Sequence, residues 1–185
     1  MTNAQYIPHQ VVKAHLAFCG SKQAQFSDLT RMKVELHEEA EYVGTVSTDG
    51  HGLLCLDIYG SKDEFGAAPF EATVDLAHLK PYTKCKGLSP LPFDEDARFP
   101  DFRGVIPEWR ELEQSAPPLG LSPILWDKVN KALKALGSGV EALRVQAPSD
   151  KHDPIRIDFT AYPKWHDNRI RGTMVIMPMR LPKEE

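Results

Sequence analysis

The sequence predicts an α+β fold, because helical and strand-like segments follow one another twice along the 185 residues. Three observations lead to this prediction. An Asp-Gly pair separates two apolar runs, a well-delimited amphipathic helix lies past the middle, and apolar strands close the chain. We therefore expect two halves, at about residues 10–66 and 118–181, with helices on one face and sheets on the other.

The first half begins with apolar residues at helical spacing, which predict a helix over residues 10–26. Short apolar runs then predict three strands, at 31–38, 42–48 and 52–60. The Asp49-Gly50 pair between the last two is a strong signal for a β-hairpin turn. Residues 70–84 are expected to form a strand that continues into a short helix, broken near Pro81.

The second half is expected to repeat this order after a proline-rich connecting segment, residues 85–123. A helix is predicted over residues 122–139, with Ser122 as its cap, Pro123 at its first position and Gly137 at its end. The closing strands are expected at 141–148, 154–162 and 169–181.

The composition excludes several classes of protein. The three cysteines, Cys19, Cys55 and Cys85, have no regular spacing and are expected to be free thiols in a reducing compartment. The N-terminus lacks a basic region followed by an apolar core, and no apolar run is long enough to cross a membrane. We therefore expect a cytoplasmic protein with no membrane partner and no cofactor.

Basic residues gather on the three predicted helices, although the net charge of the chain is −4. Lysines on any one helix usually do no more than occupy its solvent-exposed face. Three basic helices in an acidic protein could instead face a phosphate backbone, bound by charge without base readout. The candidate DNA-facing residues are Lys13, Lys22, Lys80, Lys84, Lys128, Lys131 and Lys134.

The stretch MVIMPMRL, residues 174–181, is unusual for a closing strand. After its first residue it holds two more methionines, Met177 and Met179, and an interior proline. Methionine is unbranched and polarizable, so it can repack around different apolar partners. Proline ends strand pairing and leaves apolar surface open. Met177 and Met179 are therefore either core residues or part of an adaptable binding surface.

Four stretches, taken together and in order, resemble the bacterial sliding clamp, the β subunit of DNA polymerase III. They are TVSTDGHGL (45–53), RFPDFRGVIP (98–107), the helix and strand of residues 121–145, and VIMPMRL (175–181). Clamps typically carry a T-D-G-H-R-L turn, an R-F-P-D-Y-R-R-V-L-P linker and an M-P-M-R-L C-terminus. The resemblance implies a DNA-clamp-like fold with two βαβββ-type halves, helices on one face and antiparallel sheets on the other.

A clamp chain has three domains, and this chain is about half that length. The resemblance implies a second-domain-like part with a shortened middle segment at residues 1–97, and an interdomain-type linker at 98–117. The last half of a third domain would then occupy residues 118–185. The parts that remain are those that surround one site.

In clamps the three motifs converge on a hydrophobic pocket that takes short linear peptides from polymerases and from other replication or repair proteins. The resemblance implies the same partners here. By position, the pocket would be lined by Leu29, Thr48, Gly50, His51, Leu53, Pro100, Val105, Val175, Met177, Pro178, Met179 and Arg180. A pocket that serves several partners benefits from adaptable residues.

Two glycines depart from the clamp motifs. Gly52 stands where the turn usually has arginine, and Gly104 stands where the linker has its second arginine. Both arginines are expected at the pocket rim, so their loss should widen the mouth and remove positive charge.

The sequence does not indicate an enzyme. His51 beside Asp49, and the pairs His152–Asp153 and His166–Asp167, match no metal-ligand spacing, and no phosphate loop or nucleophile motif is present. Two hypotheses remain: a peptide-binding module that keeps the pocket without the ring, or a homo-oligomeric mini-clamp that encircles double-stranded DNA as a processivity factor.

Overall fold

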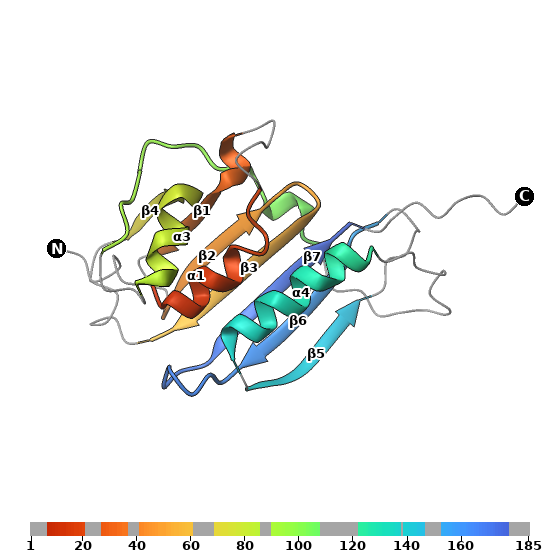
Figure 1. The fold of residues 1–185 in the computed structure, drawn as a ribbon. Helices are drawn as coiled ribbons and strands as arrows, with labels where there is room; N and C mark the ends of the chain where they lie inside the picture. The colour runs from red at the N-terminus through yellow and green to blue at the C-terminus, as the bar shows by residue number, and fades with distance from the viewer. Residues whose placement is uncertain are drawn as a thin grey trace, which may run out of the picture.

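The computed structural model describes residues 7–20, 27–36, 41–60, 69–85, 90–107, 122–137, 139–146 and 153–177. The strands within these residues form one antiparallel sheet in the order β4-β1-β2-β3-β7-β6-β5 (Figure 1). Their bounds are β1 Arg31–Leu36, β2 Tyr42–Thr48, β3 Gly52–Tyr59, β4 Phe70–Asp75, β5 Val140–Gln146, β6 Ile155–Ala161 and β7 Ile170–Ile176. The pairing of β3 with β7 joins the two halves into a single sheet.

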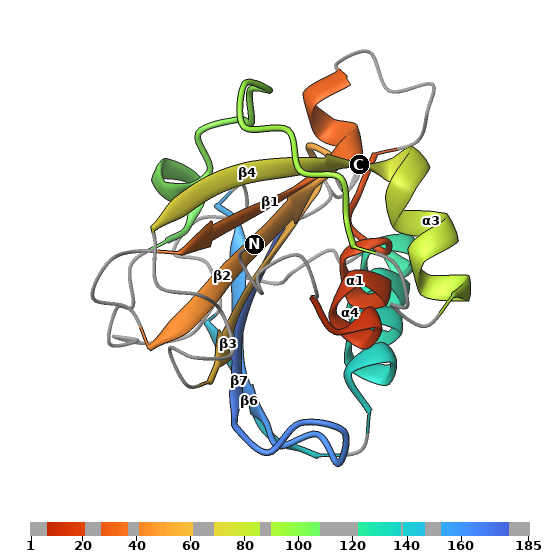
Figure 2. The same ribbon diagram turned by 90° about the vertical axis from the view of Figure 1, so that its left-hand side faces the viewer.

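The α-helices within the described residues cover one face of this sheet, which we call the helix face (Figure 2). They are α1 (His9–His15), α3 (Leu76–Lys84) and α4 (Pro123–Leu136), and α1 packs against both others. The opposite, outer face carries a short 3₁₀ helix, η3 (Arg103–Val105), drawn in green. This arrangement confirms the α+β prediction with helices on one face and antiparallel strands on the other.

The strands follow the two-residue period that this layering requires. In β6, the residues Ile155, Ile157, Phe159 and Ala161 are buried on the helix face, and the polar residues between them are half-buried on the outer face. α4 contributes a buried stripe of Leu125, Val129, Ala132 and Leu136 at helical spacing. The main core therefore lies between the helices and the sheet.

Two helices differ from their predicted extent. α1 ends at His15 instead of continuing to residue 26, and the chain then turns so that the Gly20 amide donates to the Leu29 carbonyl at 2.7 Å. α3 continues through Pro81 to Lys84. Proline at this position removes one intrahelical hydrogen bond, but Leu79 and Tyr82 pack into the core on either side of it.

A buried histidine ties α1 to β2. His15 is fully buried, and its two ring nitrogens lie 2.8 Å from the Ser47 hydroxyl and 2.7 Å from the Thr45 hydroxyl. The Thr45 hydroxyl also donates to the Leu56 carbonyl, and the Ser47 hydroxyl donates to the backbone carbonyl of His15 itself. Burial lowers the pKa of His15 to about 3, and the imidazole is therefore neutral in the fold.

The thiols are free in the structure, and burial raises the pKa of Cys19 and Cys55 to about 12. Among the described residues, no helix is long and apolar enough to cross a membrane.

Candidate functional site

The turn between β2 and β3 is held by its own side chains. The Asp49 carboxylate oxygen Oδ1 accepts from the amides of His51 and Gly52, at 3.1 and 3.0 Å. The Thr48 hydroxyl accepts from the Gly50 amide and donates to the Gly52 carbonyl. Gly50 adopts a φ of 85°, which a residue with a Cβ rarely takes. The T-D-G-H stretch therefore forms a rigid turn, as the Asp-Gly pair predicts.

This turn lies beside the end of β7. Leu53 pairs with Val175, Gly52 pairs with Ile176, and the Met177 amide donates to the His51 carbonyl at 3.1 Å. The side chain of Leu29 approaches the turn from the other side, with Cδ1 3.6 Å from where a Cβ on Gly50 would stand. Segments more than 120 residues apart in sequence are thus brought together.

The linker packs on the outer face over the same strands. Val46, Leu53, Val175 and Phe102 form a small buried cluster, with Phe99, Cys55 and Ile106 packed against it. Phe99 and Phe102 meet edge to face at 6.2 Å between ring centroids. The linker aromatics therefore cover Leu53 and Val175, two residues of the predicted pocket.

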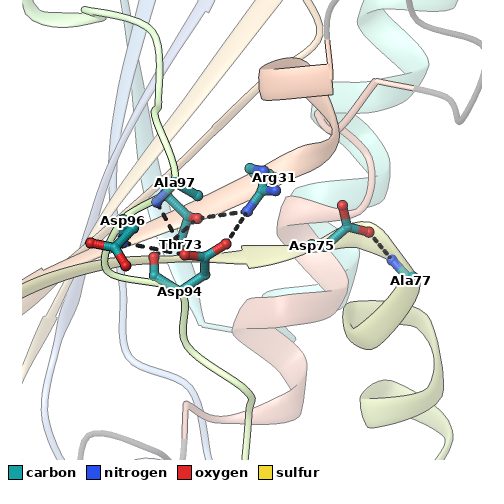
Figure 3. Close-up of polar contacts among 7 residues, drawn as sticks. All are labelled: Arg31, Thr73, Asp75, Ala77, Asp94, Asp96 and Ala97. Atoms are coloured by element: carbon teal, nitrogen blue, oxygen red, sulfur yellow. Dashed lines mark hydrogen bonds and ion pairs between the residues drawn. The ribbon is translucent and has the colours of Figure 1, made fainter.

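Polar contacts fix residues 94–107, which include the start of the linker, at three places. Figure 3 shows the first, where Arg31 bonds to Thr73 and to Asp94, and Asp94 accepts from the amides of Asp96 and Ala97. This contact holds the chain against the edge strand β4 through the paired backbones of Thr73 and Asp94.

The other two contacts lie further along the linker. Arg103 binds both oxygens of Glu35, at 2.8 and 3.0 Å, and Arg156 donates to the Pro107 carbonyl at 2.7 Å. Burial favours the neutral form of Glu35, but Lys33 and Arg103 outweigh it and hold the pKa of its carboxyl below the usual value. Residues 94–107 thus cross the sheet from β4 to β6 in a defined position.

The structure brings together most of the predicted pocket residues. Thr48, Gly50, His51, Leu53, Val175 and Met177 lie at the turn and the adjacent end of β7, and Leu29 flanks them. Val105 is the last residue of η3, and Pro100 lies between Phe99 and Phe102 in the linker. Pro178, Met179 and Arg180 lie outside the described residues.

Exposure divides these residues into a floor and a rim. Leu53 and Val175 are only 3% and 4% exposed, because the linker covers them. Met177 is 44% exposed and Val105 is 53% exposed. An apolar partner would therefore first meet Met177 and Val105.

The two glycines that replace arginines differ in surroundings. A Cβ on Gly104 would have no heavy atom within 4 Å, so this position is open. A Cβ on Gly52 would lie 3.0 Å from the ring of Phe18, which is fully buried on the helix face. The expectation of two rim positions is therefore wrong for Gly52, whose substituent would point into the core.

Gly52→Arg is accordingly expected to destabilise the fold by about 1–3 kcal/mol, because the new side chain overpacks against Phe18. Gly104→Arg serves as the matched control and should change the unfolding free energy by less than about 0.5 kcal/mol, as an exposed substitution. Chemical denaturation of both variants measures the difference. Equal stability of the two variants would contradict the burial of Gly52.

α4 contacts the turn through a residue that sequence reasoning assigned elsewhere. The Lys128 ammonium forms an ion pair with Oδ2 of Asp49, and the two side chains are only 18% and 14% exposed. Ile124 lies one helical turn before Lys128 and is 73% exposed, so it belongs to the same stripe of α4.

The remaining candidate lysines that the structure describes lie on one face of the sheet. Lys13, Lys80, Lys84, Lys131 and Lys134 are exposed on helices of the same face of the sheet. Lys131 pairs with Asp127 on its own helix. Lys22 lies outside the described residues. The ammonium of Lys128 is engaged by Asp49, unlike the exposed lysines.

A hollow of about 630 Å³, which the sequence did not predict, lies on the outer face over β3, β7, β6 and β5. Its charged lining is mixed: Arg144, Arg156 and Arg171 against Asp57 and Asp158. Arg156 and Asp158 pair with each other, and burial raises the pKa of Asp57. This balance of charge favours no one class of ligand.

The fold is that of bacterial DNA sliding clamps. The chain matches the H. pylori β clamp in complex with diflunisal at a TM-score of 0.62 and 11% identity, over 95% of this chain and 65% of that one. It matches a sliding clamp of Pseudomonas aeruginosa at 0.62 and 15%, over 98% and 66%. The DNA polymerase III β subunit of Thermotoga maritima gives 0.60 and 14%, over 95% and 65%.

These matches confirm the clamp-like fold that the sequence motifs predicted, at 11–15% sequence identity. It spans slightly less than two thirds of the length of these clamps. No protein-family model matches the chain, and no curated protein matches it.

Proposed function

We propose that this chain binds short linear peptides of replication or repair proteins at the site formed by the Thr48–Leu53 turn, the end of β7 and the linker. The observation that carries the proposal is that the turn, the end of β7 and the linker meet, and that Met177 and Val105 are exposed on two of these segments. Exposed apolar side chains mark an interaction site when they form one contiguous patch, and the proposal is that these two belong to such a patch. Solved clamps of this fold hold small molecules, including diflunisal and griselimycin.

A peptide with a Leu-Phe end suits this surface better than a charged one. Its apolar side chains would pack against Met177 and Val105, and its backbone could reach the exposed His51. Methionine tolerates anchors of different shape, which fits a site with several partners. Titration of the purified chain with a fluorescent Leu-Phe-ended peptide tests the proposal. No saturable binding at high protein concentration would reject it.

A second function, encirclement of double-stranded DNA by several copies, is favoured by the exposed lysines of α1, α3 and α4 on one face of the sheet. Their charge would meet phosphates without reading bases. The domain division at residues 98–117 and a cytoplasmic location also remain proposals. The molar mass in solution discriminates best, since a closed oligomer supports a ring and a monomer supports the peptide-binding module.

Replacing Lys13, Lys131 and Lys134 with alanine is expected to weaken DNA binding equally for all sequences, because each lysine would contact phosphate only. The slope of log affinity against log salt should become shallower by about 0.9 for each phosphate that is no longer neutralised. Filter binding across a salt series measures this slope. Retention of a circular plasmid but not of a short linear duplex would indicate encirclement, and an unchanged slope would remove these lysines from the interface.

A further inference from the structure

The Asp49 carboxylate is the one described group that joins α4, the turn and, through the turn, the end of β7. Its Oδ1 accepts from the amides of His51 and Gly52, and its Oδ2 pairs with the Lys128 ammonium. The carbonyl of His51 then accepts from the amide of Met177. A continuous chain of hydrogen bonds thus leads from a helix on one face of the sheet to the exposed methionine at the site.

The burial of this ion pair makes it more than a surface contact. Both side chains are less than one fifth exposed, so water and salt screen the pair weakly. Loss of Lys128 would leave the Asp49 charge partly buried with only backbone amides as partners. Removing one partner of such a pair costs more than the pair itself contributes, because the remaining charge is left uncompensated.

We propose that Lys128 is a positioning residue for the peptide-binding site, acting through Asp49 on the Gly50–Gly52 turn and on Met177. The inference rests on the proposed peptide binding. It gives Lys128 a role other than a DNA contact. Lys131 provides the contrast, since its ion pair with Asp127 lies within α4 and both of those side chains are more than half exposed.

The test compares Lys128→Met with Lys131→Met, which remove the same charge from the same helix. Titration of a fluorescent Leu-Phe-ended peptide should show affinity lower by roughly tenfold for Lys128→Met, as for loss of a hydrogen bond to a charged group. Lys131→Met should stay within about twofold of the wild type. Lys128→Arg keeps a cation that can reach Asp49, and it should restore most of the affinity.

Two further measurements separate positioning from general loss of structure. In Lys128→Met, the amide resonances of His51, Gly52 and Met177 should shift while those of the distant β4 stay in place. In an Asp49→Asn background, Lys128→Met should lower peptide affinity only slightly further. The Lys128–Asp49 ion pair is already absent there, so the effects of the two substitutions are not additive.

The outcomes are distinct. If the wild type binds the peptide and Lys128→Met binds it with the same affinity, the positioning role is overturned and the proposed function stands. Equal losses in Lys128→Met and Lys131→Met would show general charge attraction and would also overturn it. Failure of the wild type to bind the peptide would reject the proposed function, and the positioning role would be rejected with it.

Discussion

Peptide binding is expected to be lost when Met177 and Met179 are both replaced by alanine. Met177 is 44% exposed at the end of β7, so truncating it removes contact surface without opening a cavity in the core. Truncation of one central apolar anchor typically costs roughly 2 kcal/mol, which is about thirtyfold in affinity, and two such losses should abolish detectable binding. Anisotropy titration with a Leu-Phe-ended peptide measures the effect, and circular dichroism should show an unchanged fold.

Leu143→Ala is the matched control for this variant. The side chain of Leu143 is 41% exposed, a fraction similar to that of Met177. Leu143 lies on the edge strand β5, away from the proposed site. Its truncation should leave peptide affinity unchanged. If the methionine variant binds as tightly as the wild type, then Met177 and Met179 have no part in binding, and the site must lie elsewhere.

The protein is expected to lose stability as the pH falls below about 6.5, because of His15. The unfolded chain binds a proton at this histidine near pH 6.5, whereas burial lowers the folded pKa to about 3. Protons therefore favour the unfolded state between these values. This histidine alone should lower the unfolding free energy by about 2 kcal/mol between pH 7 and pH 5. Urea denaturation at a series of pH values measures the change.

His15→Gln supplies the control, because an amide can bond to the Ser47 and Thr45 hydroxyls but does not titrate. The variant should lose most of the pH dependence between pH 7 and pH 5, although other groups still titrate below pH 5. If the wild type and the variant decline in parallel over this range, the neutral buried state of His15 is wrong.

The sequence predicted the elements whose signals are local. The Asp49-Gly50 pair fixed the hairpin, because its conformation and its side-chain hydrogen bonds arise within six residues. α4 was also predicted closely, since Pro123, the apolar stripe and Gly137 mark its start, face and end. The end of α1 was not predicted correctly. The apolar spacing continues past His15 into the turn, where Phe18 and Cys19 still pack on the core.

The candidate site depends more on contacts between distant residues, and sequence patterns report these poorly. The motifs predicted that the turn, the linker and the end of β7 meet, and the described residues do meet there. No local pattern could reveal that Gly52 faces Phe18, that Lys128 pairs with Asp49, or that Phe102 covers Leu53. Each of these follows from the register of β3 against its neighbours, which is settled only when the sheet is complete.

The position of β7 sets the order in which this molecule can assemble. β7 follows all the other strands in the chain, yet it lies inside the sheet, between β3 and β6. Until residues 170–176 are available, both of those neighbours present open hydrogen-bonding edges. Pairing Leu53 with Val175 closes a loop of more than 120 residues, and such non-local pairing makes folding slow. The exposed edges are sites where incomplete chains pair with one another, so folding intermediates should be more prone to aggregation than the finished fold.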